Sequence, residues 1–327
     1  MDISPILKPF KISNKLELQN RIVLAPLDMQ NALSDGRVSQ RAITFHRGRS
    51  RDVGLDVVGS AYVSQDGKPG KHSLSVSRDA DIPGLTKLAA TIHGDGSKAI
   101  LQLVHAGRMT TKATTDTPIV APSAVAAGYG DFPKPTALDE DGINRIIKDF
   151  LSATDRAYKA GFDGVELHGA SSFLLQQFLS PMSNHRRDQF GVNLVGRLRF
   201  ATILVTKLVK LAKSLSPNFV VGYRLSPEEH QAEGISLSDT IGLAAVLSHL
   251  GIDYLSLSLK NYKQSAFVLP EVTNVVKMFS KVVHCPIITV GGINSVDTLT
   301  DALNQADLAG VASALIDDPN WVKKLGL

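Results

Sequence analysis

Cysteine and long apolar runs are almost absent from this sequence. Cys285 is the only cysteine among 327 residues, which excludes an intramolecular disulfide and a cysteine-rich metal cluster. No run approaches the ~20 apolar residues needed to cross a bilayer, and the start MDISPILKPFKI has no basic segment followed by an apolar core. These absences predict a soluble protein of a reducing compartment, the cytoplasm, with no membrane partner.

An excess of one charge sign is also missing. The chain has 35 Lys plus Arg against 31 Asp plus Glu, and the basic residues are spread along it, so no nucleic-acid footprint stands out and no nucleic-acid partner is expected. A small anionic ligand suits this balance better. With 43% hydrophobic and 20% charged residues, the chain can bury a large core, which excludes disorder and a fibre.

Eight short apolar runs alternate with segments of helical periodicity, the clearest of which is 143–159. Eight such units in one chain predict an α/β protein, a (β/α)8 TIM barrel, as a single domain over residues 1–327. A doubly wound open sheet is the alternative, but no GxGxxG follows the first strand. The expected strands lie at 21–26, 54–63, 98–107, 161–170, 218–226, 251–259, 286–293 and 306–313.

Two local patterns suggest sites but have simpler interpretations. The acidic run Asp139–Asp141 could be a metal site, yet carboxylates before a helical segment are better explained by the unpaired amides and positive dipole of a helix amino terminus. The peptide HGDGSKA from His93 lacks the GK[ST] ending of a phosphate loop, which favours a helix end and turn. No metal site is predicted.

Polar residues gather at the carboxyl ends of the expected strands, where parallel α/β proteins bind ligands. Gln102 and His105 end the third strand, His168 ends the fourth, and Arg224 lies near the end of the fifth. Since these ends meet on one face of a barrel, we expect the side chains to share a site.

Small residues follow the last two strands. Gly291 and Gly292 come after the seventh strand, and Ala312 and Ser313 come after the eighth. Barrels commonly bind phosphate at these two positions through backbone amides and helix amino termini, and glycine permits close backbone approach. The sequence therefore predicts a phosphate site here.

Five motifs, in order, give the chain a family resemblance from end to end. They are NRIVLAP (20–26), LQLVHAGR (101–108), APS (121–123), AGFDGVELHGA (160–170) and FLSPMSNHRRDQFG (178–191). The chain resembles the Old Yellow Enzyme family of FMN-dependent NADH:flavin oxidoreductases and NADH oxidases. The resemblance implies a TIM barrel with FMN at its top, NADH or NADPH as electron donor, and a small-molecule electron acceptor such as a quinone, nitro compound, flavin or activated alkene.

The resemblance also implies roles for the residues at the strand ends. Gln102 matches the glutamine at the flavin pyrimidine, and Arg224 matches an arginine near flavin N1 and the C2 carbonyl, where a fixed cation stabilises anionic reduced flavin. His168 matches a residue that contacts the flavin site and grips an acceptor oxygen. Three further positions correspond to backbone that lines the isoalloxazine: Pro26, Leu27 and Ser60.

The chain departs from the family pattern beside the acceptor. Ser171 stands where relatives usually have His or Asn, and Phe173 stands where they usually have the proton-donating Tyr. An α,β-unsaturated carbonyl needs a hydride and a proton, so ordinary ene reduction is in doubt. Tyr62 and Tyr262 follow strands and are substitute proton donors, or else packed side chains.

Two further departures concern the cofactor. Asp28 stands where relatives have Thr or Cys near flavin N5; an ionised carboxylate there would oppose the charge of reduced flavin, whereas a protonated one would donate a hydrogen bond. The family's Gly-Arg pair for the FMN phosphate is replaced by Ala312 and Ser313. We expect weaker FMN binding, through amides and the Ser313 hydroxyl.

Three other functions fit parts of the pattern. A class I aldolase-like lyase would use Lys260 as a Schiff base, provided that the lysine is desolvated. A metal-dependent hydrolase would use His105 and His168, but no HxH pair follows the first strand. A non-catalytic flavin-binding protein could have lost its chemistry with the tyrosine. The sequence leaves open the acceptor, the choice between NADH and NADPH, and whether the protein is a homo-oligomer.

Overall fold

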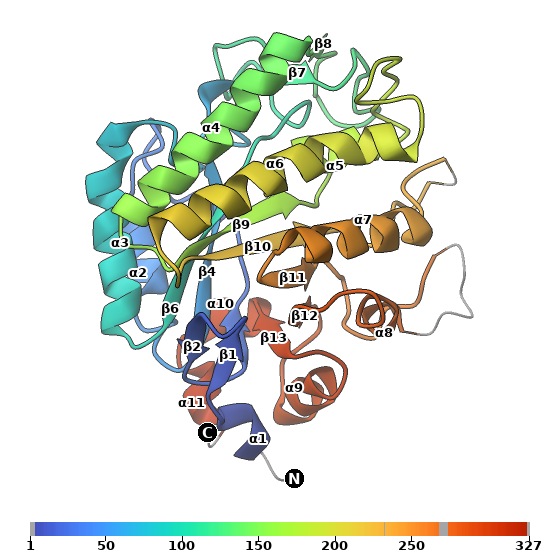
Figure 1. Ribbon diagram of the computed structural model, residues 1–327. Helices are drawn as coiled ribbons and strands as arrows, with labels where there is room; N and C mark the ends of the chain where they lie inside the picture. The colour runs from blue at the N-terminus through green and yellow to red at the C-terminus, as the bar shows by residue number, and fades with distance from the viewer. Residues whose placement is uncertain (1–3, 232, 268–273, 326–327) are drawn as a thin grey trace.

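Eight parallel strands close into a barrel in the computed structural model, which describes residues 4–231, 233–267 and 274–325. The closure is made by β3, which pairs with β13 on one side and with β4 on the other, through Val23↔Leu55. The predicted (β/α)8 barrel is therefore confirmed (Figure 1). The barrel strands are β3 (Ile22–Leu24), β4 (Leu55–Tyr62), β6 (Lys98–Val104), β9 (Gly164–Gly169), β10 (Val220–Leu225), β11 (Tyr254–Leu257), β12 (Ile287–Val290) and β13 (Leu308–Val311).

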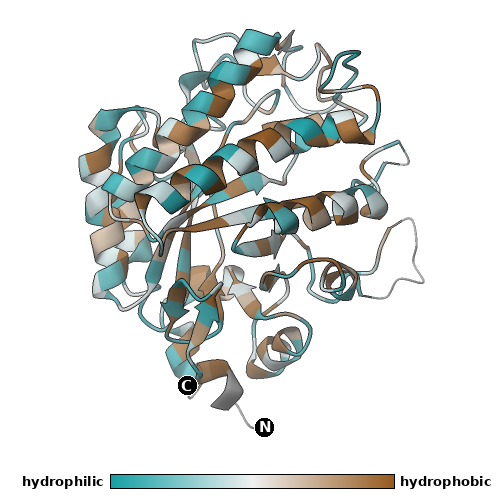
Figure 2. Cartoon of the chain, in the orientation of Figure 1, coloured by the Kyte–Doolittle hydropathy of each residue, from teal (hydrophilic) through white to brown (hydrophobic). Residues whose placement is uncertain are grey.

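Helices surround the barrel (Figure 1), and the long helix just before β9 buries one apolar face while hydrophilic residues alternate with hydrophobic ones along it (Figure 2). The barrel strands are buried nearly throughout, as expected for parallel strands covered by helices. The helices are α1 (Ser4–Leu7), α2 (Gln40–His46), α3 (Ile82–Gly94), α4 (Glu140–Lys159), α5 (Leu174–Leu179), α6 (Leu194–Leu215), α7 (Leu237–Leu250), α8 (Val275–Phe279), α9 (Val296–Leu303), α10 (Ser313–Asp317) and α11 (Trp321–Lys324), with 3-10 turns η1 (Gln65–Gly67) and η2 (Asp79–Asp81).

The two ambiguous patterns both prove to be helix ends. The Asp139 carboxylate caps α4 by accepting a hydrogen bond from the Gly142 amide at 2.7 Å. In HGDGSKA, α3 ends at Gly94, the chain turns at Gly96 with a φ of 95°, and β6 begins at Lys98. The local alternatives, a metal site and a phosphate loop, are therefore not needed.

A small hairpin, β1 (Phe10–Ile12) with β2 (Leu16–Leu18), braces the amino-terminal end of the barrel. Lys15 forms an ion pair with Asp253 at 2.8 Å, just before β11, and Ser13 donates to the Asp253 carbonyl. Two short pairings lie outside the ring of barrel strands: β5 (Leu74–Ser75) with β4, and β7 (Val120–Ala121) with β8 (Thr136–Ala137). The carboxyl ends of the barrel strands are thus left for ligands.

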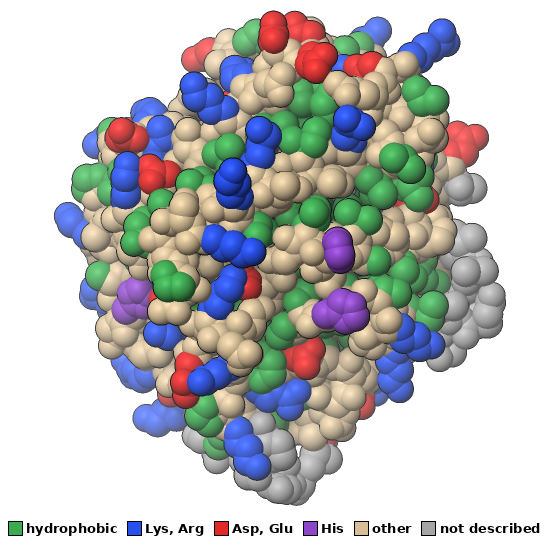
Figure 3. Space-filling model, viewed as in Figure 1, with side chains coloured by type: hydrophobic (Ala, Val, Ile, Leu, Met, Phe, Trp, Pro, Cys, Tyr) green, Lys and Arg blue, Asp and Glu red, His purple; other side chains and the backbone are tan. Residues whose placement is uncertain are grey.

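Charges on the face in Figure 3 are scattered, with Lys and Arg interspersed among acidic and apolar side chains. This agrees with the spread of basic residues along the sequence. Among the helices that the structure describes, none combines the length and the apolar character that crossing a membrane requires.

Candidate active site

Strand register brings the predicted polar residues together inside the upper barrel. Gln102 on β6 is next to Glu166 on β9, and Arg224 on β10 is next to His168 on β9. The Gln102 amide nitrogen donates to Glu166 Oε1 at 2.7 Å, and both side chains are buried. These four side chains therefore lie on the three adjacent strands β6, β9 and β10.

His168 is held neutral and oriented. Burial, and secondarily the positive charge of Arg224, lower the pKa of His168 from 6.5 to about 3. Its Nδ1 accepts a hydrogen bond from the Ala170 amide at 3.4 Å, so Nε2 carries the proton and is the donor. Phe173 packs edge-on against the imidazole, with ring centroids 5.0 Å apart at 84°. The ring is thus a fixed, neutral hydrogen-bond donor.

Arg224 supplies a cation with spare donors. Its Nη2 donates to Ser258 Oγ at 3.4 Å, but Nε and Nη1 are buried and have no partner among the described residues. Burial lowers the pKa of Arg224 and the charge of Glu166 opposes this effect, while a guanidinium stays protonated in proteins. Unpaired donors on a buried cation fit the carbonyl edge of a flavin, which becomes negative on reduction. The residues present therefore fit FMN.

Gly59 shapes the other wall, and sequence reasoning missed it. A Cβ at Gly59 would lie 2.3 Å from the Leu27 nitrogen and 2.8 Å from the Pro26 carbonyl carbon, so only glycine fits. The β4–β6 pairing shifts register between Val58 and Ala61, next to Ser60. Pro26, Leu27 and Ser60 are therefore brought together. A glycine in mid-strand, VVGSAY, is the signal that could have indicated this bulge.

Asp28 lies just beyond this wall, exposed and already hydrogen-bonded. Its carboxylate accepts from the Gln30 amide nitrogen at 3.1 Å, from Gln30 Nε2 at 2.6 Å and from Ser73 Oγ at 2.7 Å. These contacts tie the loop after β3 to the segment before β5. The Asp28 carboxyl oxygens therefore accept three hydrogen bonds from within the protein.

The turns after β12 and β13 are neighbours. Thr289 and Val290 pair with Ala309 and Gly310, so the residues that follow, Gly291–Gly292 and Ala312–Ser313, leave adjacent strands. The two glycines have φ values of 97° and 70°, and a Cβ at Gly291 would lie 2.6 Å from the Lys260 carbonyl carbon. Ser313 is exposed and opens α10. The four residues of the predicted phosphate site therefore lie on adjacent turns, and the close approach of Lys260 requires glycine at position 291.

Ser171, three residues after His168 in the chain, lines a cavity. It is exposed with a φ of 59°, and its amide donates to Ser226 Oγ at 3.3 Å. The cavity, of about 580 Å³, is lined by residues from the loops after β6, β9, β10 and β11. Its walls include Arg108, Tyr129, Ser171, Glu228, Lys260 and Phe267.

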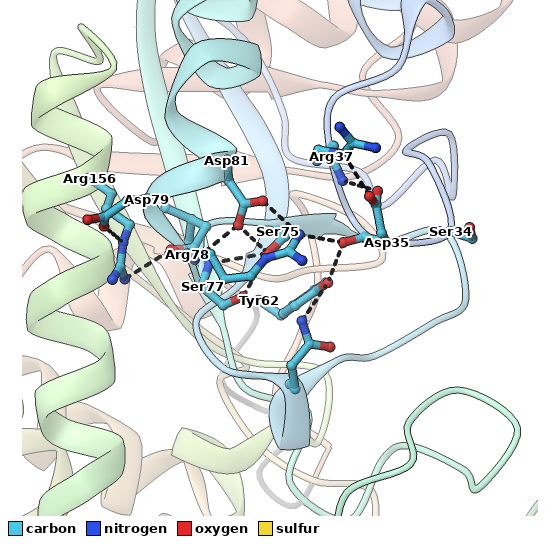
Figure 4. A network of polar contacts seen from close by, with 12 residues as sticks. Ser34, Asp35, Arg37, Tyr62, Ser75, Ser77, Arg78, Asp79, Asp81 and Arg156 are labelled. Carbon is cyan, nitrogen blue, oxygen red and sulfur yellow. Dashed lines mark hydrogen bonds and ion pairs between the residues drawn. The ribbon is translucent and has the colours of Figure 1, made fainter.

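The catalytic role assigned to Tyr62 is corrected by the structure. Tyr62 is fully buried, and its hydroxyl lies 3.3 Å from the Asp35 carbonyl oxygen, within a polar network that joins β4 to β5 (Figure 4). Tyr262 is buried as well, and its hydroxyl donates to Asp301 at 2.9 Å. Both are packed side chains, so neither is retained as a proton donor.

The lyase and the metal-dependent hydrolase lose their support. Lys260 is exposed, whereas a Schiff-base lysine needs a desolvated environment. His105 is fully buried, its Nδ1 accepts from the Gly107 amide at 3.0 Å, and its Nε2 lies 3.4 Å from Asp66. Across the described part of the chain, no three His, Cys, Asp or Glu side chains are grouped as metal ligands. His105 is a buried bracing residue.

Known proteins place the chain in a family. Residues 5–326 match the model of the NADH:flavin oxidoreductase / NADH oxidase family. The chain is 38% identical to an NADH:acrylate oxidoreductase of Vibrio harveyi, over 94% of this chain but only 32% of that protein. It is 34% identical to the probable NADH-dependent flavin oxidoreductase YqiG of Bacillus subtilis (strain 168), over 98% of this chain and 87% of that one.

A solved structure agrees with this placement. Morphinone reductase superposes with a TM-score of 0.86 at 25% identity, covering 98% of this chain and 89% of that one. The buried cation of Arg224 and the neutral His168 suit the binding and reduction of a flavin. The chain therefore belongs to the NADH:flavin oxidoreductase / NADH oxidase family, the FMN-dependent NAD(P)H oxidoreductases of the Old Yellow Enzyme type.

Proposed function

We propose that this chain transfers hydride from NADH or NADPH preferentially to acceptors that need no proton from the protein, such as quinones, nitro compounds or other flavins. Phe173 carries this proposal, because it packs 5.0 Å from the His168 ring and has no exchangeable proton. Reduction of an enone requires a proton at carbon, whereas reduction of a quinone places its protons on oxygen, where water supplies them.

The described residues divide the work. FMN, when bound, supplies the two-electron chemistry between nicotinamide and acceptor. Gln102 and Arg224 would hold its pyrimidine edge, and the Arg224 charge would favour the anionic reduced state. His168 would donate Nε2–H to an acceptor oxygen, and the Ser171 hydroxyl would add a second, shorter donor from the cavity wall.

The similarity to the acrylate oxidoreductase does not assign alkene reduction to this chain. Acrylate is an activated alkene, but the chain spans only 32% of that relative. The region of that longer protein that matches this chain and the region that reduces acrylate can be different. YqiG, which is covered over 87% of its length, is named for NADH-dependent flavin oxidoreduction and supports the proposal more directly. The cytoplasmic location and a homo-oligomer stay predictions.

The test is a comparison of acceptors. The FMN-loaded protein would be reduced anaerobically with NADH or NADPH and mixed with a quinone, a nitro compound or cyclohexenone. We expect quinone turnover to exceed enone turnover by about tenfold or more, since a positioned proton donor contributes about 10²–10⁴-fold. Phe173→Tyr should raise enone turnover selectively. Phe45→Tyr, on α2 away from the site, is the matched control. Equal turnover of quinone and enone by the unaltered protein would contradict the proposal.

A further inference from the structure

A fully buried acidic residue, Glu166, precedes His168 on β9. Glu166 is 0% exposed and sits two residues before His168, so both side chains point to the same side of the strand. Burial raises the pKa of Glu166, while Arg224 and Gln102 counter that effect. No step of the proposed reaction uses Glu166. A buried carboxyl group destabilises the folded chain unless it is hydrogen-bonded or paired with a charge.

The contact with Gln102 fixes one orientation of an amide. Gln102 Nε2 donates to Glu166 Oε1 at 2.7 Å, across the β6–β9 register. A flipped amide would place its carbonyl oxygen against Glu166 Oε1 and lose this hydrogen bond. Gln102 Oε1 is therefore kept away from Glu166 and is free to accept from another group.

The surroundings of Glu166 leave no substrate access to it. Tyr254 on β11 is fully buried, and a Cβ at Gly222 would lie 2.1 Å from the Tyr254 ring, so the ring crosses β10 where glycine leaves room. Gly222 pairs with Glu166 on one side and with Tyr254 on the other. Glu166 can therefore act on a ligand only through its neighbours.

We propose that Glu166 is a positioning residue that orients the Gln102 amide, so that Gln102 presents its carbonyl oxygen to the N3–H group of the FMN pyrimidine. The edge of the flavin pyrimidine alternates carbonyl groups with this single N–H group. With its oxygen toward N3–H, the Gln102 amide would accept a hydrogen bond, whereas the flipped amide would present its NH2 group to N3–H and lose that bond. This inference rests on the proposed FMN site and assigns it a residue that the family motif alone does not explain.

The experiment measures the FMN dissociation constant of the full chain by fluorescence titration, with Gln102→Leu, Glu166→Leu, Glu166→Gln and the double Leu variant. Gln102→Leu and Glu166→Leu should each weaken FMN binding about five- to tenfold, the range for one net hydrogen bond. Glu166→Gln retains an acceptor but adds an NH2 donor, so it can pair with either orientation of the Gln102 amide and should restore FMN binding only in part, to between the values of the unaltered chain and of Glu166→Leu. The double variant should bind no worse than either single variant, because both remove the same contact.

Other outcomes separate the possible failures. Multiplying effects in the double variant, or normal binding in Glu166→Leu beside weakened binding in Gln102→Leu, would overturn the positioning role alone. Normal binding in Gln102→Leu would overturn the placement of Gln102 in the FMN site. If Glu166→Leu does not fold, the comparison rests on the double variant, which leaves neither Gln102 nor Glu166 unpaired, and on Glu166→Gln.

Discussion

The neutral state of His168 predicts a specific loss of stability in acid. The pKa of His168 is about 3 in the folded chain against an ordinary value of 6.5, because the residue is buried, with 7% of its surface exposed, and because the positive charge of Arg224 opposes protonation. Between these values the unfolded chain binds a proton that the folded chain does not. The free energy of unfolding therefore falls as the pH drops from 6.5 toward 3. The folded chain has the full stability that the neutral His168 allows only above 6.5, the pKa of the histidine in the unfolded chain.

The magnitude follows from linkage. Between pH 7 and pH 4.5, this single group should cost the folded chain about 2.5 kcal/mol of unfolding free energy. Gln at this position does not titrate and can keep a hydrogen-bond donor. His168→Gln should therefore lose about 2.5 kcal/mol less than the unaltered chain over the same range, whatever its stability at pH 7.

The assay is urea unfolding of FMN-free protein at both pH values, so that ligand binding does not enter the linkage. The other titrating groups are shared by the two proteins, and their contributions cancel in the comparison. His249→Gln removes an exposed histidine near the end of α7 and serves as control. If the unaltered chain and His168→Gln lose stability equally, His168 is not held neutral, and its assignment as an Nε2–H donor fails with it.

Three other outcomes are expected. Ser313→Arg should tighten FMN binding about tenfold or more in a titration, because it adds a charge-assisted contact of about 1.5–3 kcal/mol at the exposed start of α10; unchanged binding would refute a phosphate deficit. Asp28→Thr should raise the FMN midpoint potential by removing a negative charge, and a lower potential would show that Asp28 acts as a donor instead. Tyr62→Phe should leave turnover within about twofold and cost about 1 kcal/mol of stability, since its hydroxyl bonds only within the packed network; a selective loss of enone turnover would reinstate it as a proton donor.

The sequence alone was sufficient to predict the barrel. Eight apolar runs that alternate with helical segments specify eight buried parallel strands, since parallel pairing needs a crossover between successive strands. Gln102, His168 and Arg224 could be predicted to lie on neighbouring strands because the carboxyl ends of such strands converge. Asp139 could be assigned to a helix cap because capping depends only on residues nearby in the chain.

Only the tertiary structure decided what each polar side chain contacts. Tyr62 ends a strand, as a site residue would, yet its hydroxyl lies 3.3 Å from the Asp35 carbonyl oxygen, 27 residues away in the chain. Glu166 lies within an apolar strand, and its partner Gln102 is 64 residues distant. Periodicity reports which face of an element a residue occupies. Partners of this kind are set by strand register, barrel closure and the space that Gly59 and Gly222 leave, and these depend on the whole packed barrel.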